Sequence, residues 1–103
     1  MPFDRLAGTG VWSGQLRFGD RGERTAAAVE LEALGYSAIW LPGGIGGAVF
    51  DDCRALLEVT ERVPLATGIL NVWMHTPEET AAGHAGLTRD FPGRFLLGLG
   101  ISH

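Results

Sequence analysis

The chain lacks lysine, has a single cysteine and has no clustered positive charge, and each shortage excludes a class of protein. Its eight basic residues are all arginines, scattered from Arg5 to Arg94, and its formal net charge is −4. Nucleic-acid binding and electrostatic attachment to membranes both depend on clustered basic residues. Cys53 has no second cysteine with which to form an intramolecular disulfide or a multi-cysteine metal site. We therefore expect no nucleic-acid partner and no membrane partner.

Long apolar runs are absent as well. No stretch approaches the ~20 apolar residues that a membrane-spanning helix needs, and residues 1–10 lack the apolar run of a secretory signal. We expect a cytoplasmic protein. Its 103 residues are 46% hydrophobic and 19% charged, which is an ordinary globular balance. Length and composition together predict one packed domain, or part of one, over residues 1–103.

Short apolar runs alternate with helical patterns along the chain. The apolar runs comprise residues 10–14, 37–41, 65–73 and 95–101. Their starts lie roughly 27 to 30 residues apart, close to the ~31 residues that each unit of a (β/α)₈ barrel occupies. The third run is continuously apolar, which is typical of a strand covered on both faces in a parallel sheet.

Three helices are predicted between these runs, at about residues 23–34, 51–62 and 76–90. Gly35 stands where a glycine commonly ends a helix. The sequence Thr76-Pro77-Glu78-Glu79 combines a capping threonine, a proline at the first helical position and a glutamate that completes a capping box. The pattern predicts an α/β fold, the N-terminal half of a (β/α)₈ TIM barrel with about four parallel strands and three helices.

A doubly wound nucleotide-binding sheet shows the same alternation and remains the less favoured alternative. Its first strand–helix turn would carry G-x-G-x-x-G, whereas residues 14–20 read GQLRFGD. Both folds bind ligands at the carboxyl ends of their strands. Trp12 and Trp73 lie nearer to strand ends than Trp40, so they are the better candidates for lining a pocket. For Gly98-Leu99-Gly100, close packing is favoured over a phosphate loop.

The three histidines differ in position. His103 ends the fourth apolar run, where it can donate a hydrogen bond or move a proton near neutral pH. His75 directly precedes a helix cap, and its interpretation as a functional or merely exposed residue stays open. His84 lies in the middle of a predicted helix and is interpreted as structural. No His, Asp or Glu cluster has the spacing of metal ligands, so no metal site is expected.

Four segments together resemble the luciferase-like monooxygenase superfamily, and most of all its actinobacterial oxidoreductases that depend on the deazaflavin coenzyme F420. They are GVWSGQLRFGD, LEALGYSAIWLPGG, PLATGILNVWMHTPEETAAGHAGL and PGRFLLGLGISH. The resemblance implies a (β/α)₈ barrel that binds reduced flavin or deazaflavin at its C-terminal rim, often as a dimer. The implied cofactor is F420, with FMN as the alternative.

The resemblance also implies roles for individual residues. Gly68 and Ile69 match a non-proline cis peptide behind the cofactor ring, and Asn71 matches a position that contacts the cofactor. With Trp12 and Trp73, these residues form the expected cofactor site. Many relatives carry an acidic residue and a histidine after the second strand, where this chain has Pro42-Gly43-Gly44. His103 therefore becomes the expected catalytic residue.

The implied reaction is hydride transfer to or from a small organic substrate. The family's phosphate site is expected beyond the fourth strand, so we expect these 103 residues alone to bind the cofactor weakly or not at all. The expected partners are a second copy of the chain, in a homo-oligomer, or the missing half of the barrel. The alternative is a non-catalytic half-barrel that associates with itself.

Overall fold

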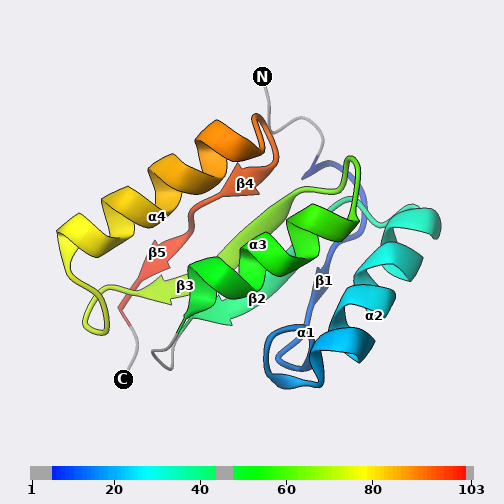
Figure 1. Ribbon diagram of the computed structural model, residues 1–103, viewed down its shortest axis with the longest axis horizontal. Helices are drawn as coiled ribbons and strands as arrows, with labels where there is room; N and C mark the ends of the chain where they lie inside the picture. Colours follow the sequence, from blue (N-terminus) through cyan, green and yellow to red (C-terminus); the bar gives the residue numbers. More distant parts are fainter. Residues whose placement is uncertain (1–5, 44–47, 102–103) are drawn as a thin grey trace.

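The computed structural model describes residues 6–43 and 48–101, which form a parallel sheet covered by helices (Figure 1). The strands run in the order β1-β2-β3-β4, and β5 also pairs with β3. Every pairing is parallel. The bounds are β1 Val11–Trp12, β2 Ile39–Gly43, β3 Leu65–Asn71, β4 Phe95–Leu96 and β5 Leu99–Gly100.

Helices follow the strands and cover one face of this sheet (Figure 1). They are α1 Gln15–Phe18, α2 Arg21–Ala33, α3 Val49–Val59 and α4 Pro77–Asp90. The sequential strand order and the helices gathered on one face are compatible with half of a TIM barrel. The predicted fold class is confirmed. A doubly wound sheet would place helices on both faces, which the described helices do not do. One short helix, α1, was not predicted.

Helix ends follow the local chemistry of the chain. The Asp20 carboxylate accepts a 3.1 Å hydrogen bond from the Glu23 N–H, so α2 begins two residues earlier than predicted. Gly35, just beyond the helix, has a φ of 88°, which a glycine adopts without steric cost. In α4 the Thr76 hydroxyl accepts from the Glu79 N–H, and the Glu79 carboxylate accepts from the Thr76 N–H. The predicted capping box is confirmed.

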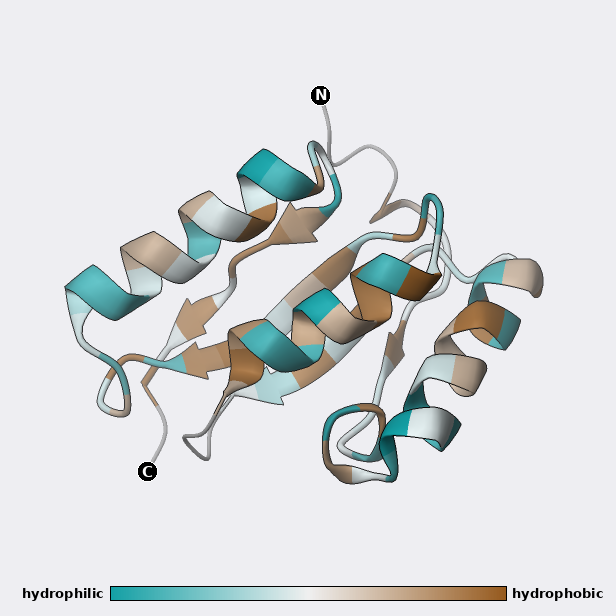
Figure 2. Ribbon diagram, in the orientation of Figure 1, coloured by the Kyte–Doolittle hydropathy of each residue, from teal (hydrophilic) through white to brown (hydrophobic). Residues whose placement is uncertain are grey.

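The core lies between the helices and the sheet. Its buried members are Leu16, Ala28, Ile39, Leu41, Cys53, Leu56, Leu57, Val63, Leu65, Leu87 and Phe95. Hydrophobic residues run along the strands, while the helices alternate between hydrophobic and hydrophilic stretches (Figure 2). Burial, with a smaller contribution from the charge of Asp52, raises the pKa of the Cys53 thiol to about 12. Cys53 is therefore a core residue and not a reactive thiol.

The strands differ from their predicted limits: β1 is shorter than residues 10–14, and β3 ends at Asn71, two residues before its predicted end. β2 continues through Pro42 and Gly43, because the β2–β3 register shifts between Leu41 and Gly43 and a proline is tolerated at such an irregularity. The predicted fourth strand is divided into β4 and β5. At the division, the Thr67 hydroxyl exchanges two 2.9 Å hydrogen bonds with the backbone N–H and carbonyl of Gly98.

No helix in the described ranges is long and apolar enough to cross a membrane.

Candidate functional site

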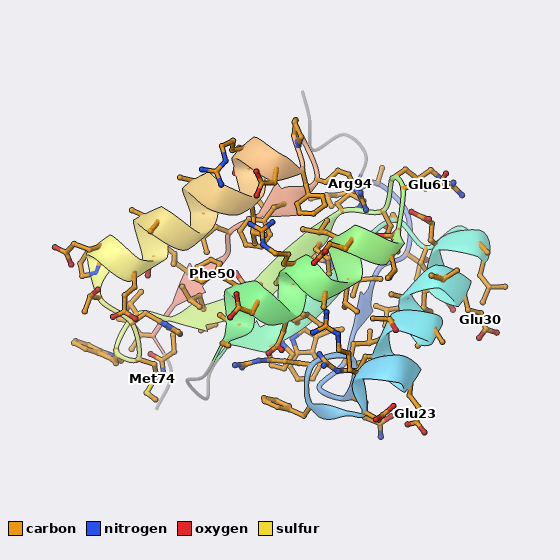
Figure 3. The ribbon with its side chains drawn as sticks, viewed as in Figure 1. Glu23, Glu30, Phe50, Glu61, Met74 and Arg94 are labelled. Atoms are coloured by element: carbon orange, nitrogen blue, oxygen red, sulfur yellow. The ribbon has the colours of Figure 1, made fainter. Side chains whose placement is uncertain are left out.

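The carboxyl ends of the strands converge on one edge of the sheet, which we call the carboxyl edge. Figure 3 shows Met74, which follows β3, at this edge, whereas Glu61 and Arg94 lie at the opposite edge. Trp12, Gly43, Asn71 and Gly100 are the last residues of their strands and border the carboxyl edge. In parallel α/β folds, the chemistry takes place at such an edge.

Trp12 and Trp40 enclose the backbone of Gly68. The Trp12 indole N–H donates a 2.6 Å hydrogen bond to the Gly68 carbonyl oxygen. A Cβ atom at Gly68 would lie 3.3 Å from both tryptophan side chains. The absence of a side chain therefore lets both indoles rest against the β3 backbone. Trp12 is nevertheless 59% exposed, so much of its ring is available to a ligand.

The Gly68–Ile69 peptide bond is cis, as the resemblance implied. Glycines on the neighbouring strands pack closely against Ile69. A Cβ at Gly43 would lie 2.7 Å from the Ile69 carbonyl oxygen, and a Cβ at Gly100 would lie 2.9 Å from the Ile69 side chain. At Gly98 a Cβ would collide with the Thr67 carbonyl oxygen. The close-packing interpretation of Gly98 and Gly100 is confirmed.

Asn71 shapes the turn that follows β3. It is buried, and its side-chain oxygen accepts a 2.9 Å hydrogen bond from the Trp73 N–H. The Met74 N–H donates to the Asn71 carbonyl at 3.1 Å. This turn leaves the Trp73 side chain 71% exposed. Other large apolar side chains exposed on the segments after β3 and around β5 are Val72, Met74, Leu99 and Ile101.

The structure therefore brings Trp12 and Gly68 into direct contact, with Ile69 as the next residue of β3. Asn71 and Trp73 lie farther along the same strand and its turn. His103 lies outside the described residues, as do residues 44–47, which come directly after Gly43 in the sequence. Across the described ranges, no group of three His, Cys, Asp or Glu side chains could hold a metal ion.

The other two histidines pack against aromatic rings. His84 is exposed, and its ring centroid lies 6.0 Å from that of Phe95. His75 lies 6.4 Å from the ring of Phe50 at an interplanar angle of 71°. Its Nε2 atom is shielded from solvent and makes no hydrogen bond within the described part of the chain.

The whole chain, residues 1–103, matches the luciferase-like monooxygenase family. The chain belongs to the luciferase-like monooxygenase family. This is a family of oxidoreductases and monooxygenases that act on small molecules with flavin-type cofactors. No curated protein matches the chain.

In this luciferase-like chain, one feature of the carboxyl edge was missed at the sequence level. Arg17, on α1, has a side chain that is only 2% exposed. Its guanidinium donates to the Asp52 carboxylate at 2.9 Å and to the Pro42 carbonyl at 3.0 Å. Arg24 approaches the same carboxylate at 3.5 Å. Arg17 thus joins the segment after β1 to the end of β2 and the start of α3. No sequence pattern marked it, because it lies in what reads as a loop.

Proposed function

We propose that this chain forms the cofactor platform of an F420-dependent oxidoreductase that transfers hydride to or from an organic substrate. The observation that carries the proposal is the contact of Trp12 with Gly68 at the carboxyl edge. It places an exposed aromatic ring beside a stretch of β3 backbone that has no side chain at Gly68. A planar, largely apolar ring is well matched to such a surface.

The residues present fit a deazaflavin or flavin ring. Gly68 leaves its backbone uncovered where any other residue would place a Cβ within 3.3 Å of two indoles. Trp12, Gly68, Ile69, Asn71 and Trp73 are the residues that would hold the ring. F420 is preferred to FMN because the four sequence segments resemble the F420-dependent enzymes most. When bound, the cofactor would donate or accept the hydride.

Each of these residues has a distinct task in the proposal. Trp12 orients the ring, because its own indole is fixed by the hydrogen bond to Gly68. Trp73, which is exposed in the turn after β3, covers the ring and excludes water. Asn71 holds the turn that carries Trp73. His103 is proposed to carry the proton that accompanies hydride transfer.

The test is a spectroscopic titration of the protein at its native length with F420 and with FMN, each oxidised and reduced. We expect saturable binding of F420 at micromolar concentration and weaker binding of FMN. The substitution His103→Gln should lower kcat far more than it raises the dissociation constant of the cofactor, because His103 is proposed to carry a proton and not to hold the ring. Failure to bind either cofactor would contradict the proposal, and tighter binding of FMN would reassign the cofactor.

A second candidate is a half-barrel that associates with itself. It is favoured by an apolar groove of about 640 Å³ between β1 and α2, with Val11, Leu16, Ala27, Leu31 and Leu34 among its lining residues. In a complete barrel, a further helix would pack beside α2 at this position. The helix would come from the other half of the barrel or from a second copy. Measuring the mass of the 103-residue chain in solution distinguishes a monomer from a closed dimer.

A further inference from the structure

A second groove opens on the segment that follows β1, apart from the Gly68–Ile69 backbone. Its volume is about 570 Å³, which lies within the ~300–1,000 Å³ typical of small-molecule sites. Its lining residues all come from one stretch of chain: Trp12, Ser13, Gly14, Gln15, Phe18 and Gly19. Only one of these, Trp12, belongs to the cofactor site expected from the sequence.

Two exposed aromatic side chains form the walls of this groove, and both are held in place. Trp12 is 59% exposed, and its indole N–H is bonded to the Gly68 carbonyl. Phe18 is 57% exposed, and the Arg17 guanidinium carbon lies 4.7 Å from the centre of its ring. Exposed aromatic rings with such fixed supports offer contact area to a ligand at little cost in conformational entropy.

The support beneath Phe18 is itself anchored in the protein. Arg17 is buried and binds both the Asp52 carboxylate and the Pro42 carbonyl. A buried guanidinium with these two partners cannot swing away from the ring without losing both interactions. The cation–π contact therefore fixes Phe18 relative to the end of β2.

The chemistry of the lining defines the class of ligand. None of the six lining residues is charged, so the groove offers no partner for an ionic group. Its polar groups are the Ser13 hydroxyl and the Gln15 carboxamide. The Ser13 oxygen accepts a 3.2 Å hydrogen bond from the Gln15 N–H, so its proton can be donated to a ligand oxygen.

We propose that this groove binds a neutral, planar aromatic group that carries a hydroxyl or carbonyl oxygen. The aromatic group lies against Trp12 and Phe18, and its oxygen accepts from Ser13. Because Trp12 also contacts Gly68, the bound group lies beside the cofactor platform. Its identification as part of the enzyme's substrate rests on the proposed function; the binding itself does not.

The experiment is equilibrium dialysis of the native-length protein, without cofactor, against 2-naphthol. Two matched probes accompany it: 2-naphthoate, which carries a negative charge, and decahydro-2-naphthol, which is saturated. We expect 2-naphthol to bind saturably and at least about fivefold more tightly than either matched probe. Equal or tighter binding of the charged or the saturated probe would overturn the stated ligand class.

Two variants locate the binding. Phe18→Leu keeps an apolar side chain but removes the ring, and it should weaken 2-naphthol binding about five- to tenfold. Val59→Ala changes an exposed apolar side chain at the end of α3 that does not line this groove, and it should leave binding unchanged. Unaltered binding by Phe18→Leu would overturn the proposal, as would absence of binding by the unmodified protein.

The outcome is separable from that of the cofactor titration. Binding of 2-naphthol without binding of F420 or FMN would retain the groove and reject the proposed function. Binding of a cofactor without binding of 2-naphthol would retain the proposed function and reject the groove as a ligand site. If both bind, Phe18→Leu should raise the dissociation constant of 2-naphthol while leaving that of the cofactor within about twofold, because Phe18 is no part of the proposed cofactor site.

Discussion

The indole N–H of Trp12 donates a 2.6 Å hydrogen bond to the carbonyl oxygen of Gly68, although 56 residues separate the two in the sequence. The bond joins the end of β1 to β3 past the intervening strand β2. Trp40, on β2, fills the space beneath it, since its ring would meet a Cβ at Gly68. The first three strands are thereby joined at the position where the cofactor is proposed to bind.

Trp12→Phe should weaken cofactor binding without unfolding the protein. The variant keeps an aromatic ring but loses the hydrogen bond to Gly68 that holds the indole in place, so cofactor affinity should fall roughly fivefold. Because Trp12 is largely exposed, the free energy of unfolding should fall by no more than the ~1 kcal/mol that this bond contributes. Cofactor titration and urea unfolding measure the two effects. A large loss of stability with unchanged affinity would show that the bond serves the fold alone.

Arg17→Met should destabilise the protein by about 2–3 kcal/mol, because it leaves the Asp52 carboxylate and the Pro42 carbonyl without their closest donor. The matched control is Arg89→Met: Arg89 also pairs with an aspartate, Asp90, but its side chain is 75% exposed. We expect no detectable change in the free energy of unfolding for Arg89→Met. The measurement is urea unfolding at neutral pH. Equal stability of the two variants would contradict the anchoring role of Arg17.

Glu32→Gln should also be destabilising, by about 2–3 kcal/mol at neutral pH. The Glu32 carboxylate accepts hydrogen bonds from the backbone N–H groups of Glu61, Arg62 and Val63. Burial alone would raise its pKa, but these hydrogen bonds and the charge of Arg62 hold the pKa below its usual range. Glu30→Gln, at an exposed position of the same helix, is the control.

The pH dependence of this effect has a definite sign. A carboxyl group whose pKa is lower in the folded protein stabilises it fully above the unfolded pKa, about 4.3 for glutamate. The contribution is lost as the pH falls through the folded pKa of Glu32. The stability difference between Glu32→Gln and the unmodified chain should therefore be constant near neutrality and narrow in acid. A difference that stays constant down to pH 2 would contradict the assigned role of the carboxylate.

Two glycines of α4 should respond oppositely to alanine. Alanine normally stabilises a helix interior by about 1 kcal/mol relative to glycine, and we expect this at Gly86, where a Cβ would lie 3.6 Å from the nearest atom. At Gly83 a Cβ would lie 2.5 Å from the ring of Phe50 (labelled in Figure 3), and that ring packs against Phe95. Gly83→Ala should therefore destabilise by about 1–3 kcal/mol. Thermal unfolding of both variants tests the packing of α3 against α4.

Much of the fold could be predicted because local signals coincide with the packing. The capping box at Thr76 and the glycine at position 35 each act within a few residues, and both are present as expected. Helix α1 could not be predicted, because its four residues are too few to form a stable helix alone and Arg17 is held by distant partners. The division of the fourth strand likewise depends on Thr67, more than 30 residues from Gly98 along the chain.

The candidate site shows the same division. Exposed tryptophans at strand ends could be selected from the sequence, because strand position is set by local apolar patterning. The contact between Trp12 and Gly68 could not be predicted, because it depends on the register of β1, β2 and β3. The support of Phe18 by Arg17 could not be predicted either, because it depends on where α1 is placed.

The sequence by itself determined the alternation of strands and helices, the ends of α4, the C-terminal end of α2 and the family, because apolar periodicity, capping residues and characteristic segments are local properties of the chain. Only the tertiary structure decided which side chains meet at the carboxyl edge. Strand pairing and the burial of Arg17 bring together groups that are far apart in the chain. Which of the many possible long-range contacts has the lowest free energy depends on the whole fold, and no local sequence pattern specifies it.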